Sequence, residues 1–289
     1  MSAQPVGPRR TPDGSWSDVT YTPIIPIGGY AGWAFLKRTM AQQTNAFNAQ
    51  PSIKRDEAYF REKIGSITTA EQLVNDPRLL RVALGAFGLE GDVGNKFFIR
   101  KVLEDGTLKT GALANKLANK QYQKLSIAFG FGDFSTPRTK LSDFADKILG
   151  PYKTQQFAVA VGTQNEDMRL ALNIEHELPV LAQTEASSLS KWFTVLGNPP
   201  LRTVFERAFG LPVSFGAIDI DKQAETLQNR SKAMFGSGDL SQFSDGDKVD
   251  KLVRQFLVRS ELAANSANLS SGQVALALLQ QTVSRSRWN

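Results

Sequence analysis

The chain of 289 residues contains no cysteine. Without thiols it forms no disulfide bond, offers no cysteine nucleophile and binds no cysteine-ligated metal. This absence does not indicate a cellular compartment, because a chain without cysteine is compatible with oxidising and reducing surroundings alike.

Long apolar runs are also absent from the sequence. No stretch approaches the ~18 consecutive apolar residues of a transmembrane helix, so we expect no membrane insertion. Residues Met1–Pro12 lack the apolar segment of a secretory signal peptide. A protein exported by a machine that needs no cleavable signal would begin in the same way.

The overall composition is that of an ordinary globular protein. Apolar residues make up 41% of the chain and charged residues 21%, which is enough to bury a substantial core. The length suggests one large domain or two smaller ones. The net charge of +6 indicates a mildly basic protein and does not by itself imply nucleic-acid binding.

The sequence contains one segment twice, at residues 76–89 and 198–211. From the proline to the final leucine the copies are identical at seven of thirteen positions, whereas unrelated sequences would match at roughly one. Each copy begins with Asp-Pro or Asn-Pro and ends with Gly-Leu. These are the residues that begin and end a helix. The repeat therefore predicts a helix that packs in the same way in two halves of the chain.

Apolar spacing predicts a helix ahead of the first copy. Trp33, Leu36, Met40 and Phe47 recur three, four and seven residues apart, which places them on one face of a helix over about residues 30–49. A strict alternation of apolar and polar residues, typical of a strand, is not sustained anywhere in the sequence.

Proline, glycine and capping residues predict where helices begin and break. Pro51 predicts the start of a second helix, Thr68–Glu71 has the spacing of a capping box, and Ser244–Asp247 predicts the start of a late helix. Gly150–Pro151 predicts a break between helices, and Pro179 an interruption.

We therefore expect an all-α protein, built from two related helical repeats with an extended or disordered N-terminal arm. Within that arm, Tyr21–Ile27 is expected to lie against the folded body. The predicted segments are an arm at 1–27, a first helical repeat at 28–138, a helical connector at 139–197, a second helical repeat at 198–262 and a helical tail at 263–289.

A basic patch is the strongest candidate for a binding site. Residues 94–125 carry seven cations and two anions, a net charge of +5. Lys116, Lys120 and Lys124 fall four residues apart, on one face of a predicted helix, and Arg100 and Lys101 lie nearby in the sequence. Such a stripe can bind phosphates or an acidic partner, but a solvated helix face is the more common explanation.

Other candidate chemical groups are few. His176, beside Glu175 and Glu177, could act as an acid or base, but a solvated histidine on a polar helix face is the favoured interpretation. Asp219 and Asp221 resemble a metal-binding pair, but they precede a predicted helix, where carboxylates cap exposed amides. We predict no catalytic residue, no metal site and no cofactor.

Short helical motifs along both halves are typical of one protein family. They are Tyr59–Ile64, Leu79–Leu80, Ala86–Leu89, Leu117–Tyr122, Ala128–Phe129, Ala208–Pro212, Asp221–Gln223 and Asp250–Arg254. Through these motifs, over about residues 30–262, the chain resembles an uncharacterised alphaproteobacterial family, a domain of unknown function described as flagellar-associated.

This resemblance implies a role linked to the bacterial flagellum. Its motifs contain no reactive group, so we expect a non-enzymatic helical protein that binds a protein partner, with a flagellar component as the leading candidate. Nucleic acid is not an expected partner, and the oligomeric state is left open. The expected location is the cytoplasm, or the flagellum after export without a cleavable signal peptide.

Two other functions are kept as alternatives. The first is a regulator that binds nucleic acid or an acidic partner through the basic patch. The second is an enzyme with a metal site at Asp219 and Asp221.

Overall fold

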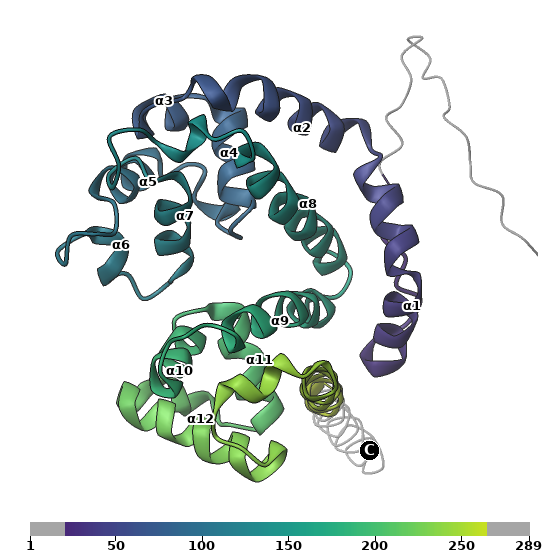
Figure 1. Cartoon of the computed structure of the whole chain (residues 1–289). Coiled ribbons are helices and arrows are strands. Elements are labelled where there is room, and N and C mark those ends of the chain that lie inside the picture. Colours follow the sequence, from purple (N-terminus) through teal and green to yellow (C-terminus); the bar gives the residue numbers. More distant parts are fainter. Residues whose placement is uncertain (1–20, 265–289) are drawn as a thin grey trace, which may run out of the picture. The chain divides into compact units, whose positions relative to one another are not determined.

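The structure, a computed structural model, describes residues 21–264 (Figure 1). Within this range the chain is helical and contains no strand, which confirms the prediction of an all-α fold. The first twenty residues of the predicted arm, and the predicted helical tail from residue 265 onward, lie outside the described residues.

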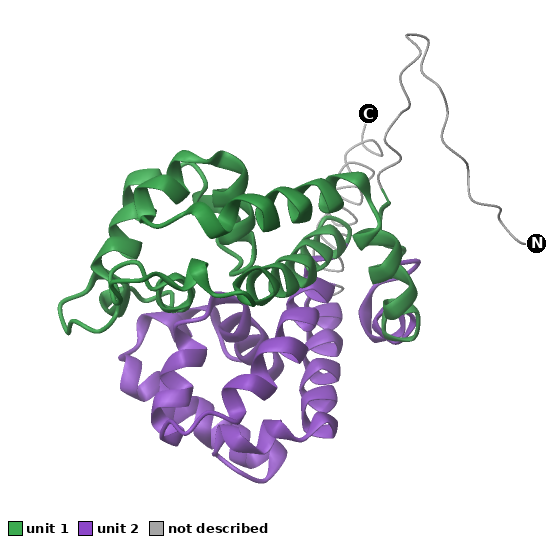
Figure 2. Ribbon diagram, turned by 45° about the horizontal axis from the view of Figure 1, so that its top comes forward, with its two compact units in different colours: residues 1–24, 36–164 green, residues 25–35, 165–289 purple. Residues whose placement is uncertain are grey.

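The chain divides into two compact units (Figure 2). In the described range, unit 1 comprises residues 21–24 and 36–164, and unit 2 comprises residues 25–35 and 165–264. The helix α1 (Gly29–Asn48) contributes its first residues to unit 2 and the rest to unit 1. The boundary after residue 164 falls inside the segment 139–197 that the sequence assigns to a connector.

Unit 1 is built around α2, α4 and α8, which pack against one another. Its core includes the fully buried side chains of Phe60, Leu80 and Phe129. The elements of this unit after α1 are α2 (Pro51–Lys63), η1 (Ile64–Ser66), α3 (Ala70–Asn75), α4 (Pro77–Gly85), η2 (Glu90–Asp92), α5 (Lys96–Asp105), α6 (Leu113–Lys116), α7 (Gln121–Phe129), η3 (Arg138–Lys140) and α8 (Phe144–Gly162).

Unit 2 has an aromatic core. The ring of Phe205 lies 5.2 Å from that of Trp192, 5.4 Å from Phe209 and 5.7 Å from Phe243, each in an edge-to-face arrangement, which is favourable for aromatic pairs. The elements of this unit are α9 (Glu166–Ala182), α10 (Ser188–Leu196), α11 (Pro199–Phe209), η4 (Val213–Ala217), α12 (Ile220–Phe235), η5 (Leu240–Ser244) and a helix over 246–264.

The duplicated segments begin with the same local structure. They form α4 and α11, each with proline in its first turn. The N-cap side chain accepts backbone hydrogen bonds in both: Asp76 from the N–H of Leu79 at 2.9 Å, and Asn198 from the N–H of Leu201 at 3.2 Å. The predicted helix starts are therefore confirmed.

The two segments also end alike. Gly88 and Gly210 have φ angles of 67° and 64°, a left-handed conformation that favours glycine. The next residue, a leucine in each copy, donates its N–H to the carbonyl five residues back, at 2.9 Å in both. Gly210 is the C-cap of α11, as predicted, whereas α4 already ends at Gly85 and Gly88 lies in the turn that follows. The relation between the two halves as wholes stays a prediction.

Three predicted boundaries are wrong. The capping box begins at Thr69, not Thr68, and its partner is Gln72. Pro151 lies inside α8 and Pro179 inside α9, so neither breaks its helix. Each proline removes one backbone N–H donor, but buried side chains on both sides of it keep the helix packed in the core.

The start of the segment ahead of α1 lies against the folded body, as predicted, and side-chain amides hold it there. The side chain of Gln43 of α1 accepts a hydrogen bond from the N–H of Ile24 at 2.7 Å and donates one to the Ile24 carbonyl at 3.1 Å. Gln50 accepts the N–H of Tyr21 at 3.1 Å, and Gln164 donates to the carbonyl of Pro23. Four backbone groups of a segment with no helix of its own thus have hydrogen-bond partners.

Candidate functional site

The predicted lysine stripe is not one face of a single helix. Lys116 is the last residue of α6, Lys120 is the N-cap of α7, and Lys124 lies in the first turns of α7. Residues 117–120 between the two helices are not helical. The spacing of four residues therefore does not align these side chains as the sequence predicted.

Most of the predicted basic patch already has intramolecular partners. Arg100 pairs with Glu104 at 2.6 Å, and Lys101 with Asp105 at 2.7 Å. Lys120 donates to two backbone carbonyls, at 3.1 and 3.2 Å. Because these contacts neutralise or occupy the charges, the patch is weaker than the sequence suggests.

The loop that follows α5 is fixed by a single carboxylate. Asp133 accepts the backbone N–H groups of Thr107 and Leu108 at 2.7 and 3.0 Å, and the Thr107 hydroxyl at 2.8 Å. Burial alone would raise the pKa of Asp133, but these donors outweigh it and lower the pKa. Gly106 and Gly132 allow the two backbone segments to approach closely here.

The structure also places the other candidate residues from the sequence, His176, Asp219 and Asp221. His176 is exposed on α9. Asp219 is the N-cap of α12 and accepts the N–H groups of Asp221 and Lys222, so capping is its observed role. In the described part of the chain, no group of three or more histidine and carboxylate side chains is placed to hold a metal ion.

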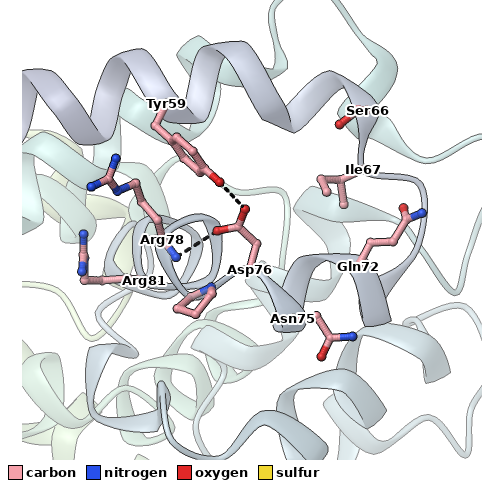
Figure 3. A pocket seen from close by; sticks show the side chains of 9 residues that line it. Tyr59, Ser66, Ile67, Gln72, Asn75, Asp76, Arg78 and Arg81 are labelled. Atoms are coloured by element: carbon pink, nitrogen blue, oxygen red, sulfur yellow. Dashed lines mark hydrogen bonds between the residues drawn. The ribbon is translucent and has the colours of Figure 1, made fainter.

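The structure reveals a surface depression, lined by both polar and apolar groups, that was not predicted from the sequence. It has a volume of about 920 Å³ and lies between α2, α3 and the start of α4 (Figure 3). We call it the α2–α4 depression. Its lining residues are Tyr59, Ser66, Ile67, Gln72, Asn75, Asp76, Pro77, Arg78 and Arg81.

A tyrosine–aspartate hydrogen bond joins two sides of this depression. The Tyr59 hydroxyl of α2 donates to Oδ2 of Asp76 at 2.7 Å (Figure 3). The other oxygen of Asp76 caps α4 by accepting two backbone N–H groups. The hydrogen bond to Asp76 raises the pKa of Tyr59. The guanidinium of Arg78 lies over the Tyr59 ring, 4.9 Å from its centre.

Behind the depression, Asp56 holds together three helices of unit 1. Its carboxylate, which is almost fully buried, accepts hydrogen bonds from Arg81 of α4 at 2.9 and 3.1 Å. It also accepts a hydrogen bond from the buried hydroxyl of Tyr152 of α8, at 2.9 Å. Burial is the largest cause that raises the pKa of Tyr152, and the negative charge of Asp56 raises the pKa further.

The carboxylates of Asp56 and Asp76 already have hydrogen-bond partners within the protein. All four of their carboxylate oxygens accept hydrogen bonds. The guanidinium side chains of Arg78 and Arg81 are 43% and 52% exposed. They can pair with a carboxylate of a partner. The contacts of Asp56 join residues 25 and 96 positions apart, which no local pattern could indicate.

Replacing Asp56 with alanine is expected to lower the free energy of unfolding by about 1–2 kcal/mol, because the buried Tyr152 hydroxyl loses its acceptor. Adding Tyr152→Phe removes that hydroxyl and should restore part of the loss. Urea unfolding of the two single variants and the double variant measures the coupling. Strictly additive losses would contradict the proposed bond.

A second surface feature is apolar. The residues after α11 form what we call the apolar loop, residues 212–220. Val213 is fully exposed, and Ile218 and Ile220 are about half exposed. The corresponding stretch after the first copy, residues 90–95, is polar and acidic. The duplicated segments therefore lead into surfaces of different character.

Comparisons with known proteins agree with this fold. A crystal structure of an Agrobacterium tumefaciens protein, determined by a structural genomics consortium, is similar with a TM-score of 0.68. It shares 27% sequence identity, and the similarity covers 84% of this chain and 99% of that chain. No curated protein matches. A family model described as "protein of unknown function (DUF1217)" matches residues 86–249, and the chain therefore belongs to this family.

Proposed function

We propose that this protein is a non-enzymatic helical interaction protein that serves flagellar assembly or structure. The observation that carries the proposal is the apolar loop of unit 2. Exposed apolar side chains that gather in one place are typical of surfaces that bind a partner. The apolar loop has three exposed apolar side chains within eight residues of the sequence, those of Val213, Ile218 and Ile220, and no described side chain covers Val213.

The flagellar part of the proposal rests on the sequence motifs. The motifs over about residues 30–262 resemble an alphaproteobacterial family described as flagellar-associated, and a similar structure comes from Agrobacterium tumefaciens, an alphaproteobacterium. No described helix is long and apolar enough to cross a membrane. The proposed location is the cytoplasm or, after export, the flagellum.

A deletion strain tests the biological role. Removing the gene is expected to impair swimming, and the wild-type chain should restore it. A complementing chain with Val213→Asp and Ile220→Asp should restore swimming poorly and weaken capture of a flagellar component at least about tenfold. Normal swimming of the deletion strain would overturn the proposal.

A matched control separates binding from folding. Ile220 is the first residue of α12 and Leu189 lies in the first turn of α10. An aspartate is favourable at either place, near a helix N-terminus. Leu189→Asp should therefore leave both swimming and partner capture unchanged. If Leu189→Asp impaired swimming and partner capture as much as the Val213→Asp, Ile220→Asp chain does, the apolar loop would not be the binding surface.

The alternatives receive less support. Binding of nucleic acid or an acidic partner would use Lys116, Lys120 and Lys124, which lie on two helices and not on one stripe. A metal enzyme would use Asp219 and Asp221, but Asp219 caps α12. Under the first alternative, replacing these three lysines with glutamate should abolish salt-dependent binding of nucleic acid or of the acidic partner, and unchanged binding would exclude it.

A further inference from the structure

A second surface depression lies within unit 2. Its walls come from the first turn of α9, the end of α11 and the last turns of the helix over 246–264. It has a volume of about 630 Å³, which is within the range of sites that bind small molecules. We call it the α11 depression. Its lining residues include Asp167, Arg207, Leu211, Arg259, Ser260 and Leu262.

The wall of this depression contains a buried hydroxyl without a partner. Ser260 is 9% exposed, and its Oγ atom has no hydrogen-bond partner. Such groups are rare, because burying a hydroxyl without a partner costs free energy. Ser231 of the same unit shows the usual arrangement: its buried hydroxyl donates to the carbonyl of Ser237 at 3.0 Å and accepts a hydrogen bond from Gln242 at 2.9 Å. The unmet hydroxyl of Ser260 therefore points to a ligand.

The charges of the lining leave one positive charge in excess. Arg207 pairs with Asp167 at 2.6 Å. Arg259 is exposed, and its guanidinium lies against Gly210, where a side chain of that residue would begin. Among residues 21–264 no carboxylate pairs with Arg259. Two guanidinium groups and one carboxylate can therefore accept one monovalent anion.

The rest of the lining is apolar and narrows the class of anion. Leu211 and Leu262 lie beside the arginines, together with Ala263 and Ala264. Free phosphate would leave these side chains in water, whereas a carboxylate that carries an aliphatic group would cover them. Carboxylates also match the planar, two-pronged geometry of arginine.

We propose that the α11 depression binds a carboxylate joined to a short aliphatic group, as found at the C-terminal end of a peptide or in a short fatty acid. Arg207 and Arg259 bind the carboxylate, and the Ser260 hydroxyl donates a hydrogen bond to it. The aliphatic group packs on the leucines of the lining. The site does not depend on the flagellar role or on the apolar loop, because its binding is a property of the purified full-length protein.

NMR titration of the full-length protein tests the ligand class. N-acetyl-leucine, which has a carboxylate beside an aliphatic side chain, should shift the backbone amide resonances of Gly210 and Ser260 at millimolar concentration. N-acetyl-leucinamide has the same shape without the charge and should bind at least about tenfold more weakly, because charge-assisted hydrogen bonds are lost. Hexanoate distinguishes the two sources: tighter binding than that of N-acetyl-leucine assigns the site to a fatty acid, and weaker binding assigns it to a peptide end.

A matched pair of arginine substitutions tests the charge. Arg259→Gln should weaken binding of N-acetyl-leucine at least about tenfold, because it removes the guanidinium that has no partner in the protein. Arg254→Gln is the same chemical change on the same helix. Arg254 does not line the depression, and its guanidinium lies over the ring of Tyr30, so binding should be unchanged.

A pair of serine substitutions separates a ligand contact from a structural one. Ser260→Ala should weaken binding of N-acetyl-leucine about threefold or more and leave the urea midpoint unchanged or raised, because the lost hydroxyl has no partner in the protein. Ser231→Ala should lower the urea midpoint and leave binding unchanged, because the Ser231 hydroxyl is bonded and lies outside the depression.

The outcomes that would overturn the proposal are equally specific. One is that neither N-acetyl-leucine nor hexanoate shifts the Gly210 and Ser260 resonances. Another is that inorganic phosphate binds as tightly as the two carboxylates do. Equal weakening by Arg259→Gln and Arg254→Gln would also overturn it, as would a urea midpoint that falls as far in Ser260→Ala as in Ser231→Ala.

Discussion

Replacing Phe205 with alanine is expected to lower the free energy of unfolding by about 3–5 kcal/mol. The side chain is fully buried and its ring contacts those of Trp192, Phe209 and Phe243. The substitution removes three edge-to-face contacts and leaves a cavity that helices fixed by their own caps cannot close. Urea unfolding followed by circular dichroism measures the loss.

Phe97→Ala is the matched control for this prediction. Phe97 lies in the first turn of α5 and is 84% exposed, so the same chemical change should alter the free energy of unfolding by less than about 0.5 kcal/mol. A loss at Phe97 as large as that at Phe205 would mean that Phe97 is buried in solution.

The second large effect is expected at Gly132. A Cβ atom at this position would lie 2.3 Å from the carbonyl oxygen of Glu104 and 2.4 Å from the amide nitrogen of Gly106. Both are backbone atoms, so no side-chain rotation relieves the overlap. Gly132→Ala should lower the free energy of unfolding by about 2–3 kcal/mol and loosen the loop that Asp133 holds.

Gly111→Ala provides the comparison in the same region. No atom lies within 4 Å of the position that its Cβ would occupy, so the substitution should be neutral or stabilise slightly by restricting the unfolded chain. Hydrogen exchange of the Thr107 and Leu108 amides should become faster in Gly132→Ala and stay unchanged in Gly111→Ala. Unchanged exchange in both variants would contradict the close approach.

Helix ends are the part of this fold that the sequence predicts best. Asp76-Pro77 and Asn198-Pro199 begin helices, and Gly210 ends one, because these preferences depend on the backbone of the residue itself. The same reasoning fails at Pro151. There, burial of Ile148, Leu149 and Tyr152 keeps α8 continuous through a residue that usually breaks a helix.

The candidate surfaces were predictable only in part. The lysine spacing of residues 116–124 assumes a continuous helix, but α6 ends at Lys116 and α7 begins at Gln121. The contacts of Asp56 with Arg81 and Tyr152 join distant parts of the chain. The exposure of Val213 depends on how η4 turns after α11. Such features arise from tertiary packing and leave no periodic signal.

The fastening of residues 21–24 has a consequence for synthesis on the ribosome. Gln43 can bind Ile24 as soon as α1 has formed, but the carbonyl of Pro23 is bound by Gln164, 141 residues later. At about 5–20 residues per second, translation takes roughly 7–30 s to cover that distance. Over that interval the start of unit 1 is held by only part of its final contacts, and its attachment is complete only after α8 and Gln164 have been made.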